Sequence, residues 1–280
     1  MDAYRFAGGT AVVTGAASGI GEALAVQLAA RGSNLVLVDC DEERLDGVAE
    51  GLRAAHPGLA VDTYVVDLSD DAATAAAAEA LATGHPETTL LVNNAGVALG
   101  GRFDQVSLEE FDWVMAVNFR SVVRLTHAFL PVLKSHPGAH LVNVSSVFGI
   151  FAPAGQAAYS ASKFAVRGLS EALRHELAEN RIGVTVVHPG GIKTRSAESA
   201  RTGSGVSVEE YEQGRKQFAK LLTMPPATAA ARIMAAIERR RPRLLIGWSA
   251  TVPDVLVRLM PGSYWNLIAR RAAPAKRSSS

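Results

Sequence analysis

Short runs of aliphatic and β-branched residues recur along the chain, and longer segments with helix-spaced apolar positions lie between them. The segments 21–31 and 158–180 are examples of these longer segments, and both are amphipathic. Short strands that alternate with helices are typical of repeated βαβ units, in which helices cover both faces of a parallel sheet. The pattern therefore predicts an α/β fold with a doubly wound parallel sheet. The seven candidate strands are Thr10–Thr14, Asn34–Val38, Asp62–Val66, Leu90–Asn93, His140–Ser145, Val184–His188 and Leu244–Ile246.

Two regions depart from this alternation. Residues 195–224 carry no strand signal and are rich in Ser, Gly, Glu and Lys, so we expect a long, mobile insertion that serves as a substrate lid. Residues 272–280 have the composition of a disordered tail. No Pro-, Gly- or Ser-rich linker divides the rest, so residues 1–271 are expected to form a single domain.

The segment 253–271 combines apolar with basic side chains, which is compatible with an amphipathic helix on a membrane surface. Pro253 and Pro261 are expected to prevent one long helix. Packing on the same domain or on a neighbouring subunit is therefore favoured, and a membrane contact is the alternative. The apolar members are Val255, Leu256, Leu259, Met260, Trp265, Leu267 and Ile268, and the basic members are Arg258, Arg270 and Arg271.

Composition narrows the choice of partner. A hydrophobic fraction of 48% with 20% charged residues provides enough apolar material for a buried sheet. The 28 Lys and Arg residues nearly balance the 27 Asp and Glu residues, so the charge gives no sign of nucleic-acid binding, and a small-molecule partner is expected. None of the 7 histidines has the spacing of a zinc site, so no metal is expected.

The only cysteine, Cys40, excludes an intramolecular disulfide and is typical of a reducing compartment. Residues 1–10 lack the basic and apolar regions of a signal peptide. No apolar run approaches the roughly 18 residues of a membrane-spanning helix. We therefore expect a cytoplasmic protein.

A glycine-rich turn follows the first candidate strand, and a helix is expected from Glu22 onward. Glycines at this place allow a tight turn and a close approach of the backbone to a pyrophosphate, while the helix N-terminus offers free N–H groups. Glycine clusters also make ordinary turns, so the motif alone is weak. Together with the strand ends described next, it predicts a Rossmann-like dinucleotide site. The expected cofactor contacts in the turn are Gly15, Ser18, Gly19, Ile20 and Gly21.

Polar and small residues follow other strands at the same edge of the sheet, outside which ligands bind in this kind of fold. Asp39 closes the second strand, where a carboxylate accepts hydrogen bonds from the adenosine ribose and repels a 2′-phosphate. Arg44 is the only nearby cation in the sequence, so NAD is predicted over NADP. Further cofactor contacts are expected at Asp67 and Leu68 after the third strand and at Asn94, Ala95 and Gly96 after the fourth.

Tyr159 and Lys163 stand four residues apart in a helical segment, so both side chains leave the same face. A phenol with an ordinary pKa near ~10 is a poor base at neutral pH, but a neighbouring ammonium lowers that pKa. Such a pair also occurs by chance. Its position after the other motifs makes Tyr159 the candidate proton-transfer group.

In this order, these motifs resemble those of the short-chain dehydrogenase/reductase family, in its shorter-chain branch. The resemblance extends from Thr10 to Thr194 and more loosely to Ile246. It implies a catalytic tetrad and contacts to the nicotinamide end of the cofactor after the sixth strand. The tetrad is Asn118, Ser146, Tyr159 and Lys163, and the nicotinamide contacts are Tyr159, Lys163, Pro189, Gly190, Ile192 and Thr194.

The resemblance implies hydride transfer between NAD(H) and an alcohol or ketone. Ser146 would hold the substrate oxygen and Tyr159 would exchange its proton, while Lys163 would lower the tyrosine pKa and hold the nicotinamide ribose. Asn118 would support a water that connects Lys163 to solvent. Two alternatives stay open, that Ser145 takes the role of Ser146, and that Asn118 only caps or kinks its helix.

A non-catalytic dinucleotide sensor or scaffold on the same fold is the other function considered, and the presence of both Tyr159 and Lys163 disfavours it. Apolar residues at 147–152 and in the insertion are expected to wall the pocket, which predicts an apolar substrate. The resemblance also implies a homo-oligomer, a dimer or a homotetramer. The expected wall in the insertion consists of Phe218, Leu221, Leu222 and Met224.

Overall fold

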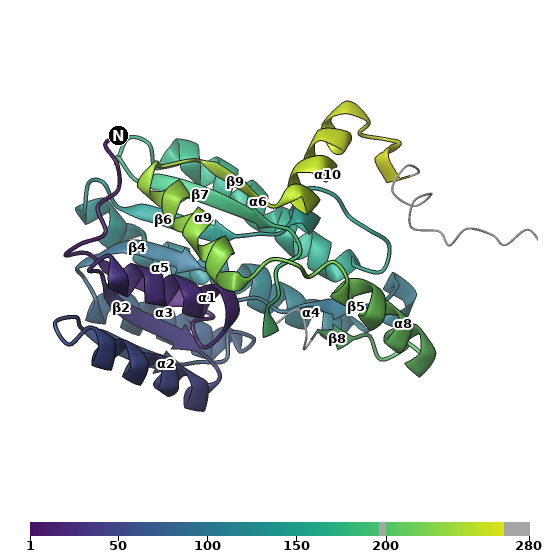
Figure 1. Cartoon of the computed structure of the whole chain (residues 1–280), viewed down its shortest axis with the longest axis horizontal. Helices are drawn as coiled ribbons and strands as arrows, with labels where there is room; N and C mark the ends of the chain where they lie inside the picture. The colour runs from purple at the N-terminus through teal and green to yellow at the C-terminus, as the bar shows by residue number, and fades with distance from the viewer. Residues whose placement is uncertain (196–199, 266–280) are drawn as a thin grey trace, which may run out of the picture.

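A computed structural model of the chain describes residues 1–195 and 200–265 (Figure 1). Seven parallel strands form the main sheet of this part, in the order β3-β2-β1-β4-β6-β7-β9. The sheet confirms the predicted fold class, a single Rossmann-like α/β domain, and all seven predicted strands. The strands are β1 (Thr10–Thr14), β2 (Asn34–Asp39), β3 (Val61–Val65), β4 (Thr88–Asn93), β6 (His140–Val144), β7 (Gly183–Pro189) and β9 (Arg243–Ile246).

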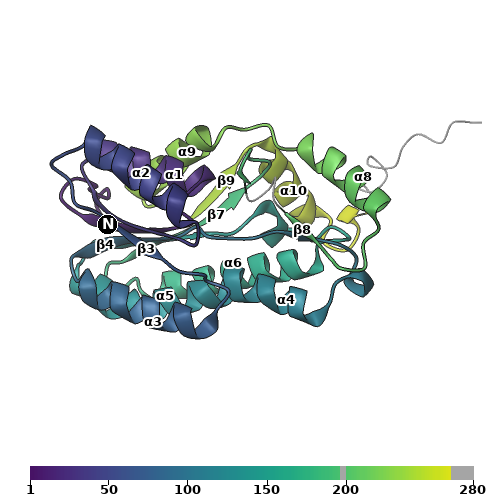
Figure 2. The same cartoon turned by 90° about the horizontal axis from the view of Figure 1, so that it is seen from below.

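Helices cover both faces of the sheet, as Figure 2 shows. One face carries α1 (Gly19–Ala30), α2 (Glu42–Ala55) and α9 (Pro226–Glu238), and the other carries α3 (Asp71–Gly84), α5 (Ser121–Ser135) and α6 (Ala157–Glu176). The central strands are apolar on both sides. Successive residues point to opposite faces, so that in β1 Val13 lies in one apolar core and Val12 in the other. This packing fixes the carboxyl ends of the strands along one edge.

The predicted insertion contains structure that the sequence did not indicate. A small second sheet pairs β5 (Leu99–Gly100) with β8 (Arg201–Thr202), and α8 (Val208–Ala219) follows. The prediction that 195–224 has no strand is therefore wrong. The sequence carries no signal for β8 because two loops pair over only two residues, a contact extended by the Gly203 N–H, which donates to the Gly100 carbonyl at 2.8 Å. Its role as a lid stays a prediction.

The C-terminal segment forms α10 (Trp248–Leu259), which runs through Pro253. The helix ends at Leu259, before Pro261, which agrees with the expectation that the two prolines prevent one long helix. Pro253 itself lies inside the helix, where its missing N–H removes one helical bond. Ala250 is fully buried, and the Asp254 carboxylate pairs with Arg243 of β9, so this helix packs on its own domain. Residues 266–271 and the predicted tail at 272–280 lie outside the described part. None of the described helices is long and apolar enough to cross a membrane.

Two further helical elements position the site. α4 (Leu108–Met115) continues through a π-helical turn at Ala116–Arg120 into α5. Short 3₁₀ turns occur at Phe103–Gln105 and, directly after β6, at Val147–Gly149. The π-helical turn contains Asn118 of the predicted site, and such turns are frequent at functional sites.

Candidate active site

The glycine turn is built so that backbone, without side chains, faces the open edge of the sheet. α1 begins at Gly19, three residues before the expected Glu22, and Gly15 and Gly19 have positive φ of 67° and 61°. A Cβ at Gly21 would overlap the Gly15 carbonyl oxygen, and one at Gly15 would come within 2.9 Å of the Ala95 Cα. The turn therefore leaves room for a phosphate group at the N-terminus of α1.

The loop after β4 is tied to this turn. The Asn94 side-chain amide donates to the carbonyls of Thr14 and Gly15, at 3.0 and 3.2 Å. The Thr14 hydroxyl in turn accepts from the N–H groups of Asn94 and Ala95, both at 3.0 Å. Asn94 thus fixes the backbone of the glycine turn, and it also lines the pocket beside Ala95 and Gly96.

Asp39 lines the same pocket at the end of β2, with both carboxylate oxygens held by backbone N–H groups. One oxygen accepts from Ala17 of the glycine turn at 3.0 Å, and the other from Cys40 at 2.8 Å. Two residues on, Asp41 forms ion pairs with Arg44 at 3.2 Å and with Arg195 at 3.0 Å. The sequence had suggested Arg44 as the only cation near Asp39, so Arg195 was missed, because it is distant along the chain.

Asn118 is fully buried in the π-turn, where it fastens the backbone after β4. Its carbonyl oxygen accepts from the Val97 N–H at 2.8 Å, and its amide donates to the Val97 carbonyl and to the Ser162 hydroxyl, each at 3.0 Å. A Cβ on Gly96 would lie 3.1 Å from the Lys163 Nζ and 3.2 Å from the Asn118 Oδ1. Asn118 and Lys163 therefore both pack against the side of Gly96 where a Cβ would stand.

The two serines after β6 have different partners. The Ser145 hydroxyl donates to the Lys163 carbonyl at 2.8 Å, which commits it to the backbone of α6. The Ser146 hydroxyl accepts from the Phe148 N–H at 3.1 Å and faces Tyr159, whose pKa it lowers. The Ser146 carbonyl is held by His188 Nδ1 at 2.9 Å, and since burial lowers the His188 pKa to about 4, this neutral ring donates the bond.

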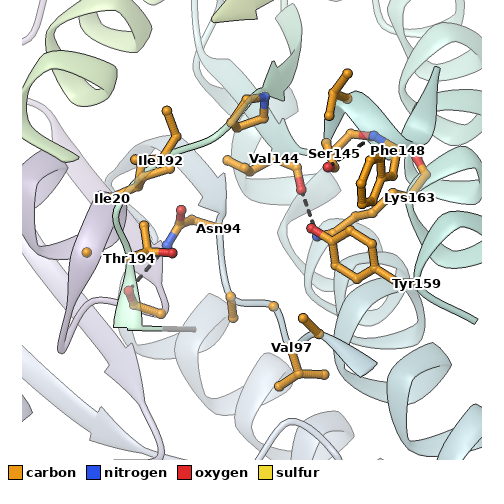
Figure 3. A pocket seen from close by; sticks show the side chains of 18 of the residues that line it. Ile20, Asn94, Val97, Val144, Ser145, Phe148, Tyr159, Lys163, Ile192 and Thr194 are labelled. Atoms are coloured by element: carbon orange, nitrogen blue, oxygen red, sulfur yellow. Dashed lines mark hydrogen bonds between the residues drawn. The ribbon is translucent and has the colours of Figure 1, made fainter. Parts of the chain in front are cut away.

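Tyr159 and Lys163 lie side by side in the pocket (Figure 3), with the Lys163 Nζ 5.8 Å from the centre of the Tyr159 ring. Lys163 is 3% exposed, and its Nζ donates to the Val144 carbonyl at 3.1 Å. Burial lowers the pKa of Lys163 to about 8 and raises the pKa of Tyr159, although the hydrogen bond with Ser146 acts in the opposite direction. The expected lowering of the Tyr159 pKa by Lys163 is therefore wrong for the chain alone, because desolvation dominates.

The turn after β7 borders the site next to the glycine turn. The Gly190 N–H donates to the Ile246 carbonyl at 3.0 Å, and Ile192 pairs with Met224 from the insertion. The Thr194 side chain approaches Gly19 so closely that a Cβ added there would lie 3.2 Å from it. Figure 3 shows Ile192 and Thr194 beside Ile20.

A cavity of about 870 Å³ joins these parts into one site. Every predicted site residue lines it except Gly21 and Asn118, which support residues that do. Of the predicted wall, Val147, Phe148, Phe151, Leu221 and Leu222 line it, whereas Gly149, Ile150, Ala152 and Met224 do not, and the Phe218 side chain is outside the described part.

Other lining residues were missed by the sequence interpretation. They come from α4, from the N-cap of α6, from β8 and from α10, four places without a motif that could have marked them. α10 was expected to pack on its own domain or on a neighbouring subunit, with a membrane contact as the alternative, and one of its faces also forms a wall of the cavity. The missed residues with large side chains are Trp113, Gln156, Arg201, Trp248, Val252 and Leu256.

Comparison with known proteins agrees with this geometry. The family model described as short chain dehydrogenase matches residues 9–205. The Mycobacterium tuberculosis oxidoreductase SadH is 39% identical over 272 residues, which cover 96% of this chain and 96% of that protein.

Solved structures agree as well. A short-chain dehydrogenase/reductase from Burkholderia phymatum in complex with NAD has a TM-score of 0.81 and 30% identity, covering 99% of this chain and 100% of that one. A short-chain dehydrogenase from Sphingobium yanoikuyae in complex with NADPH has a TM-score of 0.75 and 27% identity, covering 97% and 99%. The chain therefore belongs to the short-chain dehydrogenase/reductase family of oxidoreductases.

Proposed function

We propose that this protein transfers a hydride between NAD(H) and an apolar alcohol or ketone, with Tyr159 as the general acid and base. One observation carries the proposal: the Tyr159 hydroxyl, the Ser146 hydroxyl and the Lys163 ammonium converge in one cavity with the glycine turn. Ser146 holds the substrate oxygen, and Tyr159 passes a proton to it or takes one from it. Because burial raises its pKa, Tyr159 in the free chain keeps its proton at neutral pH, ready to donate to a carbonyl.

The residues present fit a nicotinamide dinucleotide. The fit rests on the cradle at Gly15, Gly19 and Gly21, where side chains would fill the space of a pyrophosphate or distort the turn. Lys163 would hold the nicotinamide ribose, and Ile192 and Thr194 would contact the nicotinamide end. When bound, the cofactor supplies or accepts the hydride. Asn118 serves as a positioning residue, since its side chain holds the backbone of Val97.

NAD is proposed over NADP because of Asp39. Its carboxylate lies in the cavity at the end of β2, where a 2′-phosphate would bring a second negative charge. The two nearby arginines, Arg44 and Arg195, are both paired with Asp41. The similar protein from Burkholderia phymatum was solved with NAD and that from Sphingobium yanoikuyae with NADPH, so the preference needs its own measurement.

The test is a panel of alcohols of increasing apolar bulk with NAD, followed by NADH formation, on the wild type and on Tyr159→Phe. Bulky apolar alcohols should give a higher kcat/KM than ethanol or glycerol. Tyr159→Phe should lower kcat by about 10²-fold or more while NADH still binds, and Tyr64→Phe serves as the matched control. Equal turnover of glycerol would contradict the apolar substrate, and a normal kcat in Tyr159→Phe would contradict the role of Tyr159.

We also propose that the chain forms a homo-oligomer. Trp248, Val252, Val255 and Leu259 lie on one face of α10 and are 75%, 47%, 48% and 75% exposed, which leaves an apolar stripe open. Light scattering at micromolar concentration should report a dimer or tetramer. A monomer that binds to liposomes would instead favour the alternative, a membrane contact at this helix.

A further inference from the structure

The cavity has one cationic side chain that the proposed chemistry does not use. Four charged residues among the described ones line it: Asp39 and Asp67 follow β2 and β3, and Lys163 stands beside Tyr159. The fourth is Arg201, on β8 of the small second sheet. The walls near it are apolar, so Arg201 is the charged group that a substrate would meet away from Tyr159.

Arg201 is held in place by its backbone and by an aromatic ring. Its N–H donates to the Ala98 carbonyl at 3.0 Å, and its guanidinium carbon lies 4.1 Å from the centre of the Trp113 ring. Stacking uses the flat face of a guanidinium and leaves the N–H donors in its plane available. The ring therefore orients Arg201 without satisfying its hydrogen-bonding groups.

No carboxylate within the described ranges forms an ion pair with Arg201. The contrast is Arg102, in the neighbouring loop, which pairs with Asp104 at 3.0 Å and lies 3.9 Å from Glu210. An arginine that is stacked, lines a pocket and has no acidic partner is arranged for an anion that comes from outside the chain.

Gln156 provides a second, neutral donor near the same wall. It lines the cavity as the N-cap residue of α6, three positions before Tyr159, and its side chain makes no hydrogen bond with the described residues. A bridge between Gln156 and Gly101 places it beside β5, the strand that pairs with β8.

We propose that Arg201 binds an oxyanion, either a carboxylate or a phosphate ester, at the end of an otherwise apolar substrate, with Gln156 as an additional donor. The inference rests on the proposed function only in that Tyr159 marks the reacting end. Both anions match the forked donors of a guanidinium. Arg201 is exposed, so the anion lies at the mouth of the cavity while the apolar part contacts side chains such as Trp113, Val147 and Phe148.

The test measures binding without turnover. Octanoate, octyl phosphate and 1-octanol are titrated into the full chain by calorimetry, with intrinsic tryptophan fluorescence as a second signal, since Trp113 and Trp248 line the cavity. A charge-assisted pair at this site should make at least one anion bind about tenfold or more tightly than 1-octanol. Arg201→Gln should abolish that preference and Arg201→Lys should reduce it. Arg232→Gln, which removes an exposed charge far from the cavity, should retain it.

Equal binding of all three probes to the wild type, or an unchanged preference in Arg201→Gln, would overturn the proposal. The tighter of the two anions identifies the group that is recognised. Because the measurement needs no reaction, a preference for anions in a protein that oxidises no alcohol would refute the proposed function and leave the role of Arg201 intact. Circular dichroism checks that each variant is folded.

Discussion

Replacing Lys163 by Met should make the protein more stable at neutral pH while removing its activity. Lys163 is 3% exposed, and burial lowers its pKa from 10.5 to about 8. Each pKa unit corresponds to about 1.4 kcal/mol, so holding the ammonium in the fold costs about 3 kcal/mol. Methionine has a similar length and no charge, but it loses the bond to the Val144 carbonyl, which contributes about 1 kcal/mol. The net gain expected at pH 7 is about 2 kcal/mol.

The pH dependence separates this effect from ordinary repacking. The unfolded chain keeps the Lys163 proton up to its usual pKa of 10.5, whereas the folded chain loses it near 8. Between these values the unfolded state binds more protons, so the wild type becomes more stable as the pH rises, and the advantage of Lys163→Met shrinks. Urea unfolding at pH 7 and pH 9.5 measures the difference. Lys134→Met, on the exposed side of α5, is the control.

A Lys163→Met variant that is less stable than the wild type at pH 7 would refute this reasoning, and so would a stability difference that is equal at the two pH values. An active variant would separately refute the proposed role of Lys163. The prediction thus tests whether an active-site group is kept at a cost in stability.

Three further predictions concern the cofactor cradle and the core. Asp39→Asn removes a charge but keeps an acceptor for the Ala17 N–H, and it should lower the ratio of kcat/KM for NAD over that for NADP by about tenfold or more. Asp46→Asn is the control, and an unchanged ratio in Asp39→Asn would exclude Asp39 as the residue that discriminates between the cofactors. Gly21→Ala should weaken NADH binding, because the added Cβ would overlap the Gly15 carbonyl oxygen. In the control Gly47→Ala, in α2, the added Cβ meets no atom within 4 Å, so this variant should bind NADH normally. Equal binding by both variants would contradict the proposed role of the glycine turn in cofactor binding. His188→Gln should reduce the loss of stability between pH 7 and 4.5 by about 2–3 kcal/mol. Burial lowers the His188 pKa from 6.5 to about 4, so in this pH range the unfolded chain binds a proton that the folded chain does not bind. A variant that loses as much stability on acidification as the wild type would contradict this prediction.

The sheet could be predicted from the sequence because its signal is local and repeated. The central strands are apolar on both faces, so runs such as Leu90–Asn93 stand out from the amphipathic helices beside them. The motifs at the carboxyl ends of the strands must meet at one edge of the sheet to bind a single ligand, which places the site. Helix starts were less certain: the glycine turn indicated a helix at Glu22, but the first turn of α1 already includes Gly19 and Ile20.

The remainder could not be predicted, since it depends on contacts between segments far apart in the chain. Arg195 reaches Asp41 across 154 positions, and Arg201 meets Trp113 only after two loops pair as β5 and β8. The burial of a side chain likewise depends on segments that are far apart in the chain. The spacing of Tyr159 and Lys163 predicted that one would lower the pKa of the other, but spacing carries no information about how much water the fold removes around both.

The burial of this pair also bears on how the site works. A buried ammonium and a buried phenol each favour their neutral form, so the chain alone holds Tyr159 protonated and brings the Lys163 pKa close to neutral pH. In a cavity with so little water, a charge that a ligand brings in would act strongly on both groups. Ser145 and Asn118 fix the backbone around both residues, through the Lys163 carbonyl and through Val97. The fold therefore supplies fixed positions with little water around them, and the pKa values of both side chains would respond to the charge of a ligand.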